Sequence, residues 1–320
     1  MRIPALIAAA AIVLTACGTT ENTSAAPTTA AGGPVTVTDA RGKNVELKAP
    51  ARKVVALEWG EAEIVASLGV MPVGVADTAG YKTWNAAAPL DASVKDIGKR
   101  SEPSVDAIVA LDPDVVVMAQ ERDSTLVPQL EKYVPVVVTK SSDAARNLDR
   151  LREDVRMIAK AVGKSAEGDK LLSDMDAKLA EGRKAVEAGG ASGTPFLMAD
   201  GWLEGSTVSI RPFGKGSLVS DVAEQVGLKN AWTGQVDPQW GLGQTDVEGL
   251  SGLTDPKTVL FYSASEDDVF TTGLARNPVW QRLPFVASKK VTKLDTGTWT
   301  FGGPKSVGSI ADQLVRAVTA

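Results

Sequence analysis

Short apolar runs alternate with helical patterns along the first part of the chain. Four runs of four or five residues are rich in valine, as expected for strands buried on both faces of a sheet. Between them, apolar residues recur every three or four positions, which indicates helices. Short connections between strand and helix predict parallel α/β packing, with strands at 53–57, 73–76, 114–118 and 135–139 and helices at 61–68, 104–110 and 125–132.

The pattern changes after Ser141. From 144 to 162, apolar residues at helical spacing form one face and charged residues fill the other. This predicts a long amphipathic helix that ends at Gly163, with a second helix at 166–188. The α/β pattern then returns, with strands predicted at 195–199, 207–211, 258–262 and 290–294 and helices at 218–226 and 305–318.

The two halves of the chain contain a similar unit. Residues 105–117 and 247–260 each consist of a valine, an acid, a short amphipathic helix, a turn and an apolar strand. Any helix–turn–strand unit shares this order, so coincidence stays open. The acids Asp106 and Glu248 are 142 positions apart, about the length of one domain. We therefore expect an α/β fold of two similar lobes with parallel-type central sheets, at 35–143 and 164–320, joined by a single long helix at 144–163.

The chain begins with an apolar segment that resembles a signal peptide. Arg2 precedes a run from Ile3 to Leu14, which is too short to span a bilayer as a helix. Leu14-Thr-Ala-Cys17 resembles the lipobox of bacterial lipoproteins. This implies cleavage after residue 16, lipid on Cys17 and anchoring to the outer face of the cell membrane. A plain secretory signal stays open, and both readings predict export. Residues 17–34, rich in Thr, Ala and Gly, predict a flexible tether.

Composition excludes several kinds of chemistry. The 320 residues include no histidine and one cysteine, so zinc sites and Cys- or His-based nucleophiles are excluded. The net charge of −5 becomes −6 without residues 1–16, because 33 Lys and Arg then face 39 Asp and Glu. This gives no reason to expect nucleic acid as a partner. The adjacent acids Asp267 and Asp268 are typical of a charged loop. Acids that are distant in the sequence can still meet as a glycosidase-like pair, so a lipid-anchored secreted hydrolase stays open as an alternative, although we expect no enzyme.

Several motifs, in this order and spacing, resemble the substrate-binding proteins of metal-chelate ABC importers from about Val35 to the end of the chain. Among these, the pattern is most similar to binders of ferric hydroxamate siderophores of the ferrichrome type. The resemblance implies two lobes of the class III periplasmic-binding-protein type and capture of a ferric siderophore for an ABC importer. The motifs are Val55-Ala-Leu-Glu-Trp59, Ile97-Gly-Lys-Arg100-Ser-Glu-Pro103, Phe213-Gly-Lys-Gly-Ser217, Asn277-Pro-Val-Trp280 and Thr298-Trp299-Thr-Phe-Gly302.

The resemblance also implies ligand contacts. Arg100 occupies a Gly-x-Arg-x-x-Pro position carried over from hydroxamate binders, and an arginine fork suits the oxygens of a hydroxamate shell. Trp240 and Trp299 stand in glycine-rich loops, and Trp59 follows the first buried strand, where α/β crevices form. Indole rings suit the apolar periphery of such a ligand. Weaker candidates are Arg211, Tyr81 and Trp84. Because the siderophore brings its own iron ligands, no metal ligands or cofactor are expected from the protein.

The two repeated acids have a separate implied role. In the family, an acid at this place in each lobe docks onto arginines of the permease, so Asp106 and Glu248 are the candidates here. Acids at helix starts are also favoured by the helix dipole, and this alternative stays open. We expect a monomer with a ferric siderophore and a permease as partners. A binder of another chelate, such as ferric citrate, cobalamin or haem, is the main alternative function.

Overall fold

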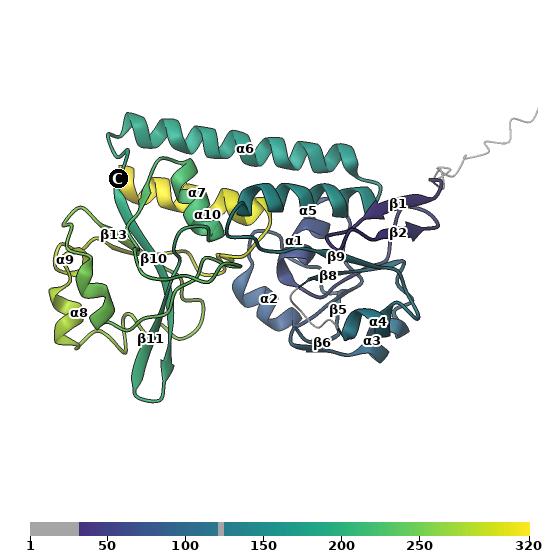
Figure 1. Ribbon diagram of the computed structural model, residues 1–320, viewed down its shortest axis with the longest axis horizontal. Helices are drawn as coiled ribbons and strands as arrows, with labels where there is room; N and C mark the ends of the chain where they lie inside the picture. The colour runs from purple at the N-terminus through teal and green to yellow at the C-terminus, as the bar shows by residue number, and fades with distance from the viewer. Residues whose placement is uncertain (1–31, 121–124) are drawn as a thin grey trace, which may run out of the picture. The chain divides into compact units, whose positions relative to one another are not determined.

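The computed structural model describes residues 32–120 and 125–320 (Figure 1). The predicted signal peptide, the lipidation site Cys17 and most of the predicted tether lie outside the described residues. Within these ranges, no helix has the length and apolar character needed to cross a membrane.

The first sheet contains five strands, all parallel, in the order β5-β4-β3-β8-β9. Three of its strands, β3, β8 and β9, are the valine-rich runs, and every residue in them is buried, as expected for strands of a parallel sheet covered on both faces. Two small hairpins, β1–β2 and β6–β7, flank it. The elements are β1 (Val35–Thr38), β2 (Asn44–Leu47), β3 (Val54–Ala56), α1 (Trp59–Ser67), β4 (Gly74–Val75), α2 (Thr78–Trp84), β5 (Lys95–Asp96), β6 (Gly98–Lys99), β7 (Glu102–Pro103), α3 (Val105–Ala110), β8 (Val115–Ala119), α4 (Leu126–Leu130) and β9 (Val136–Thr139).

The second sheet has the order β11-β10-β13-β14, with β12 also paired to β10. Its strands are parallel except for β10 and β11, which form an antiparallel hairpin. Gly205, with φ of +63°, supplies the left-handed conformation that this tight turn requires. The elements are β10 (Pro195–Glu204), β11 (Thr207–Pro212), α7 (Leu218–Gln225), β12 (Lys229–Asn230), the 3-10 helix η1 (Glu248–Gly252), β13 (Val259–Tyr262), α8 (Pro278–Arg282), α9 (Pro284–Ala287), β14 (Val291–Lys293) and α10 (Pro304–Thr319).

Two helices, α5 (Asn147–Ala161) and α6 (Ser165–Ala188), link the sheets along the chain. Gly163, with φ of +67°, lies in the turn between them. Figure 1 shows α6 running past α5 and then past α7 and α10. Glycines allow this close approach: a Cβ on Gly168 would clash with Ala159, and one on Gly182 would press on Val226. The lobe and helix boundaries predicted from the sequence stay predictions.

One apolar cluster connects the two sheets. It includes Val54 and Val117 of the first sheet, Phe196 and Phe261 of the second, and the inward faces of α5, α6 and α10. The amphipathic pattern of residues 144–162 therefore predicts the packing of α5 correctly, since its apolar stripe is buried in this cluster.

The sequence reasoning missed the elements without strong periodicity. Helix α2 is one of them. Asp77, the residue before it, caps the helix by accepting a hydrogen bond from the Gly80 backbone amide at 3.0 Å. Helices α8 and α9 are also short, and each starts with a proline. The hairpin of β10 and β11 extends five residues further along β10 than the predicted strand, which ended at Ala199.

Candidate functional site

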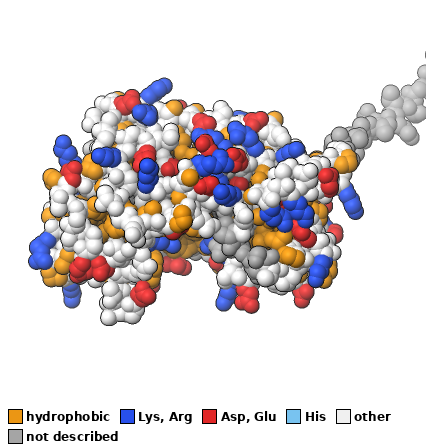
Figure 2. All heavy atoms as spheres, in the orientation of Figure 1, with side chains coloured by type: hydrophobic (Ala, Val, Ile, Leu, Met, Phe, Trp, Pro, Cys, Tyr) orange, Lys and Arg blue, Asp and Glu red, His pale blue; other side chains and the backbone are white. Residues whose placement is uncertain are grey.

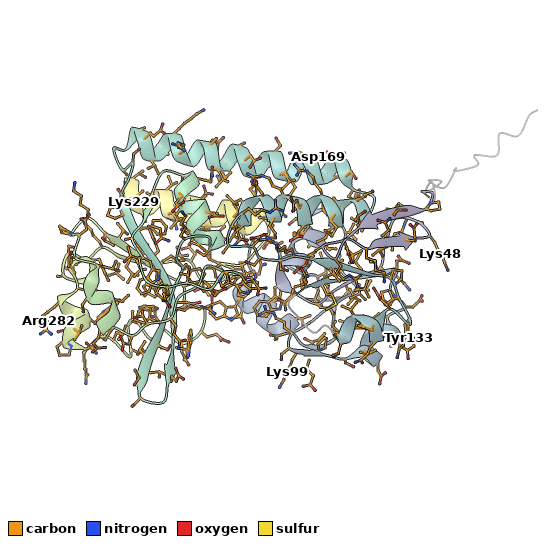
Figure 3. All side chains as sticks on the ribbon, in the orientation of Figure 1. Lys48, Lys99, Tyr133, Asp169, Lys229 and Arg282 are labelled. Atoms are coloured by element: carbon orange, nitrogen blue, oxygen red, sulfur yellow. The ribbon has the colours of Figure 1, made fainter. Side chains whose placement is uncertain are left out.

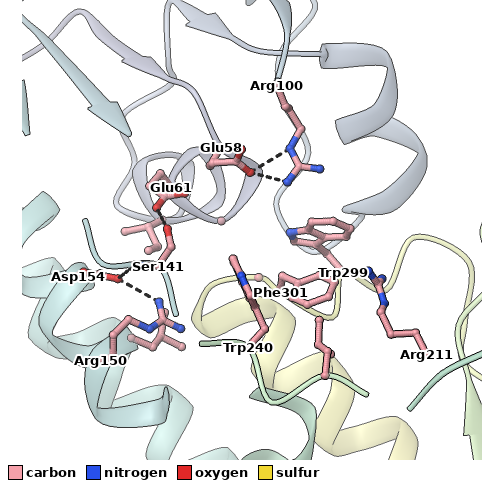
Figure 4. Close-up of a pocket in the computed structure, with 15 residues that line it drawn as sticks. Glu58, Glu61, Arg100, Ser141, Arg150, Asp154, Arg211, Trp240, Trp299 and Phe301 are labelled. Atoms are coloured by element: carbon pink, nitrogen blue, oxygen red, sulfur yellow. Dashed lines mark hydrogen bonds and ion pairs between the residues drawn. The ribbon is translucent and has the colours of Figure 1, made fainter. Parts of the chain in front are cut away.

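A cavity of about 430 Å³ lies where loops of both sheets meet (Figure 4). Its volume is within the range of small-molecule sites. Residues after β3, β6 and β9 reach it from the first sheet, and α5 supplies Leu151 and the Arg150–Asp154 pair. Arg211 on β11 and residues at 240–242 and 299–302 reach it from the second sheet. The side chains that define its chemistry are Glu58, Glu61, Arg100, Ser141, Arg150, Asp154, Arg211, Trp240, Trp299 and Phe301.

The first wall of the cavity consists of Glu58 and Arg100, with Trp59 directly behind them. Arg100 lies at the tip of the β6–β7 hairpin and donates from Nε and Nη2 to Glu58 Oε2, at 2.9 and 2.5 Å. Its Cζ lies 4.3 Å from the centre of the Trp59 ring, a cation–π distance. Trp59 is in turn fixed by its Nε1, which donates to the Ala76 carbonyl at 3.0 Å. The neighbouring Lys99 lies at the surface instead (Figure 3).

The second wall consists of Arg211 and Phe301, with Asp200 as the hydrogen-bond partner of Arg211. Arg211 on β11 faces Asp200 on β10 across the hairpin and donates to both carboxylate oxygens, at 2.9 and 2.5 Å. The Arg211 Cζ lies 5.4 Å from the Phe301 ring centre. Burial raises the pKa of Asp200, and the Arg211 guanidinium opposes that rise.

Indole and phenyl rings connect the two walls. The Trp299 ring centre lies 4.8 Å from that of Trp59 and 5.2 Å from that of Phe301. Trp240 meets Phe301 edge to face at 5.4 Å. These rings form a continuous apolar surface between the two arginines, which is a suitable contact for the organic part of a ligand.

The other end of the cavity is polar. Glu61 accepts hydrogen bonds from Ser141 and from Thr139 Oγ1, and Arg150 Nη1 donates to Asp154 at 3.0 Å. Burial raises the pKa of Asp154, the Arg150 charge lowers it, and the Glu61 charge raises it. Every arginine at the cavity therefore has a carboxylate partner. Among the described residues, no group of three or more His, Cys, Asp or Glu side chains could hold a metal ion.

A buried carboxylate fixes the segment that carries Trp299 and Phe301. Glu63 on α1 is fully buried and accepts hydrogen bonds from Ser306 N and Oγ at the start of α10, at 2.8 and 2.6 Å, and from Asn85 Nδ2 at 2.9 Å. A carboxylate is favoured at a helix N-terminus. Glu63 thus ties the first sheet's helix to the segment that leads into α10.

The predicted ligand contacts fall into two groups. Arg100, Arg211, Trp240 and Trp299 line the cavity. The other three lie behind it. Trp59 supports Arg100, and Tyr81 is only 1% exposed and donates to the Ala88 carbonyl at 2.6 Å. The Trp84 ring centre lies 6.4 Å from the Trp299 ring centre.

Sequence reasoning missed Glu58, Glu61, Arg150, Asp154 and Phe301. A signal for two of them was present. Arg150 and Asp154 are spaced i, i+4 on the helix face that also carries Leu151 and Val155, so they break the apolar stripe of α5. Charged residues on a buried face need partners, and this indicates a buried ion pair.

The two repeated acids lie away from the cavity. Asp106 is exposed in the first turn of α3, whose Ser104 cap accepts from the Ala107 amide at 3.2 Å. Glu248 is exposed at the start of η1. The second unit of the predicted repeat thus begins with a 3-10 helix and not with an α-helix like the first.

Comparison with known proteins identifies the family. Residues 54–297 match the model of a family described as periplasmic binding protein. The chain is 26% identical over 272 residues to the iron(3+)-hydroxamate-binding protein FhuD of Escherichia coli, covering 83% of this chain and 86% of FhuD. It is also 26% identical over 318 residues to the Fe(3+)-citrate-binding protein YfmC of Bacillus subtilis, covering 97% and 94%.

A solved structure has the same fold. The Fe3+-Desferal-bound siderophore-binding protein FhuD from Vibrio cholerae has a TM-score of 0.73 and 25% identity, covering 84% of this chain and 98% of that one. The predicted α/β fold of two sheets and the family resemblance drawn from the motifs are both confirmed. The chain belongs to the periplasmic binding protein family, a family of solute-binding proteins.

Proposed function

We propose that this protein captures a ferric hydroxamate siderophore in the cavity and delivers it to an ABC importer. One observation carries the proposal: the arginines that face the cavity, Arg100, Arg150 and Arg211, are each paired with a carboxylate, and aromatic rings lie between the walls.

Ferric hydroxamate and ferric citrate complexes differ in net charge. Three hydroxamates carry three negative charges, so they neutralise Fe3+, whereas a ferric citrate complex keeps a large negative charge. The cavity has no surplus of arginine charge for a polyanion. A paired arginine still serves a neutral chelate, because its planar fork has five N–H donors and two nitrogens of Arg100 are directed at Glu58.

The names of the relatives include both hydroxamate and citrate, so the choice between these two ligands depends on the residues of the cavity. FhuD of Escherichia coli is named for hydroxamate and YfmC of Bacillus subtilis for citrate, at the same identity. The aromatic surface of Trp240, Trp299 and Phe301 favours the larger, partly apolar hydroxamate ligand. In this proposal, iron stays within its own ligand shell, and the protein supplies neither a metal ligand nor a cofactor and catalyses no reaction.

The proposal extends to the cell surface. The protein is exported, anchored to the membrane by lipid on Cys17, and acts as a monomer with lobes at 35–143 and 164–320. The exposed acids Asp106 and Glu248, one in each lobe, dock onto basic residues of the permease. Figure 2 shows acidic and basic side chains interspersed on the face it displays, which fits local ion pairs better than binding to a polyanion such as nucleic acid.

Titration of the purified protein tests the ligand. We expect ferric desferrioxamine B and ferrichrome to quench tryptophan fluorescence in a saturable way, because Trp240 and Trp299 line the cavity and Trp59 lies directly behind it. Ferric dicitrate should bind at least tenfold more weakly. Tighter binding of ferric dicitrate would replace the hydroxamate assignment with the citrate alternative, and quenching by none of the three would remove the siderophore function.

Charge reversal tests the docking role. Asp106→Lys with Glu248→Lys should abolish uptake of iron chelate by cells while leaving the affinity of the purified protein unchanged. A matched control reverses two other exposed acids, Asp91→Lys and Glu266→Lys, and should keep uptake. Uptake that survives the first pair, or that is lost equally with both pairs, would exclude a specific role for Asp106 and Glu248.

A further inference from the structure

The β10–β11 hairpin, which bears Arg211 of the second wall, extends beyond the cavity. Its register pairs Asp200 with Arg211 and Trp202 with Ser209. Directly paired residues share a face, and side chains alternate along a strand, so Asp200, Trp202 and Arg211 project from the same face. The apolar clusters agree with this alternation. Met198 and Phe213 continue this face into the large cluster, whereas residues of the opposite face, such as Ile210, belong to a separate one.

Trp202 is next to the arginine of the second wall. The Arg211 Cζ lies 5.7 Å from the Trp202 ring and 5.4 Å from the Phe301 ring, so the guanidinium stands between two aromatic rings. Phe301 lines the cavity and Trp202 lies further along the hairpin. The aromatic surface is therefore interrupted by one cation and then continues on the hairpin, which Figure 1 shows extending away from the other strands.

Trp202 is unusual in its exposure. All seven tryptophans lie within the described residues, and Trp202, at 41%, is the only one classed as exposed. An indole held beside a ligand-facing arginine but open to water has a large apolar area available for contact.

We infer that Trp202 is a specificity-determining residue that covers the organic periphery of the bound chelate. The inference rests on the proposed function and adds a contact outside the cavity. A chelate seated between Arg100 and Arg211 is larger than its iron centre, and the chains that join its hydroxamates extend toward the hairpin. The indole contacts these chains and not the oxygens around iron, so it distinguishes large linked chelates from small ones with the same iron shell.

The chain offers a matched control in the next residue. Leu203 is also exposed, at 57%, but alternation places it on the opposite face, near Gly273. Loss of Leu203 removes exposed apolar area from the same hairpin without touching the face that carries Arg211.

Isothermal titration of the purified protein with two probes tests the inference. Ferric desferrioxamine B has linked hydroxamates, and ferric tris(acetohydroxamate), kept intact by excess acetohydroxamic acid, has the same iron shell without linkers. Trp202→Ala should weaken binding of the linked chelate about 5- to 20-fold and of the unlinked chelate less than twofold. Leu203→Ala should change neither more than twofold, and Trp202→Phe should keep most of the affinity.

Two results would overturn the inference while leaving the proposed function intact. One is an affinity of Trp202→Ala for the linked chelate within twofold of the unchanged protein. The other is an equal loss for both chelates, which would show that the indole acts by positioning Arg211. Failure of the unchanged protein to bind any ferric chelate is a different result, since it would remove the proposed function and this inference with it.

Discussion

The two arginine–carboxylate pairs at the cavity differ in how they are supported. Arg100 lies over the Trp59 ring at 4.3 Å, and the side chain of its partner Glu58 is only 9% exposed, at the start of a helix packed on the first sheet. Arg211 and Asp200 stand on a hairpin, and their side chains are 33% and 17% exposed. The Arg211 Cζ lies 5.4 to 5.8 Å from the ring centres of Phe301, Trp202 and Phe213, further than Arg100 lies from Trp59.

This difference indicates unequal roles for the two walls. A guanidinium that is held by a ring and a buried carboxylate keeps its geometry before the ligand arrives, so little ordering is needed on binding. The pair on the hairpin is less constrained and suits adjustment to the size of the chelate. We therefore expect the first wall to supply more of the affinity and the second wall to supply more of the selectivity.

Both walls contact one ligand only if the distance between them is maintained. Removing Glu63 should disturb that distance more than any other change proposed for the two walls. Glu63→Ala leaves the Ser306 amide, its hydroxyl and the Asn85 amide without their acceptor. Unsatisfied buried donors cost about 1–3 kcal/mol each, so we expect a loss of about 4 kcal/mol in the free energy of unfolding. Urea unfolding measures it, and chelate affinity should fall as well.

Glu63→Gln is the matched control for this prediction. The amide oxygen still accepts from Ser306, so about 1–2 kcal/mol should be lost instead. Equal stability of Glu63→Ala and the unchanged protein would show that water replaces the carboxylate and that the tie contributes little.

Removing Arg100 should produce the largest loss of affinity among the wall residues. We expect Arg100→Ala to weaken binding of ferric desferrioxamine B about 30-fold, or about 2 kcal/mol. It should also lower the free energy of unfolding by about 1–2 kcal/mol, because Glu58 loses its guanidinium partner in a partly buried site. Titration and urea unfolding measure the two effects.

Two controls separate these effects. Lys99→Ala, at the exposed neighbouring position, should change neither quantity. Arg100→Met with Glu58→Gln should recover stability but not affinity. An Arg100→Ala protein that binds normally would exclude the first wall as the main source of affinity.

The sequence predicted the fold better than the partners within the site. Buried valine runs and one long amphipathic helix have strong periodicity, and the structure confirms them as β3, β8, β9 and α5. The motif around Arg100 identified one arginine at the cavity. Its partner Glu58 is 42 positions away, and nothing local in the sequence predicts that the two meet.

The hairpin shows a different limit. The apolar run of β10 ends at Ala199, so the predicted strand ended there too, and residues 200–204 were assigned to no strand. Their pairing depends on the Gly205 turn and on β11, which together set the register. For that reason, neither Asp200 nor Trp202 was predicted as a site residue, although Arg211 was.

Arg211→Ala should have a smaller effect on affinity than Arg100→Ala, and a more selective one. We expect about fivefold weaker binding of ferric desferrioxamine B, because the second wall keeps Phe301 and Trp202. Calorimetric titration of both single variants under one condition gives the ratio. A larger loss for Arg211→Ala than for Arg100→Ala would reverse the roles assigned to the two walls.

The smallest effect concerns the pH dependence of stability at the second wall. Burial raises the pKa of Asp200 in the folded protein, so between pH 3.8 and that raised pKa the folded state binds more protons than the unfolded state. The free energy of unfolding therefore falls as pH rises through this window.

Arg211 opposes the rise in the pKa of Asp200, so Arg211→Ala extends the window to higher pH. The destabilisation caused by Arg211→Ala should consequently be larger at pH 7 than at pH 4.5, by about 1 kcal/mol in urea unfolding. Adding Asp200→Asn removes the titrating group and should make the difference independent of pH. If the double variant keeps the pH dependence, another acid must be its source.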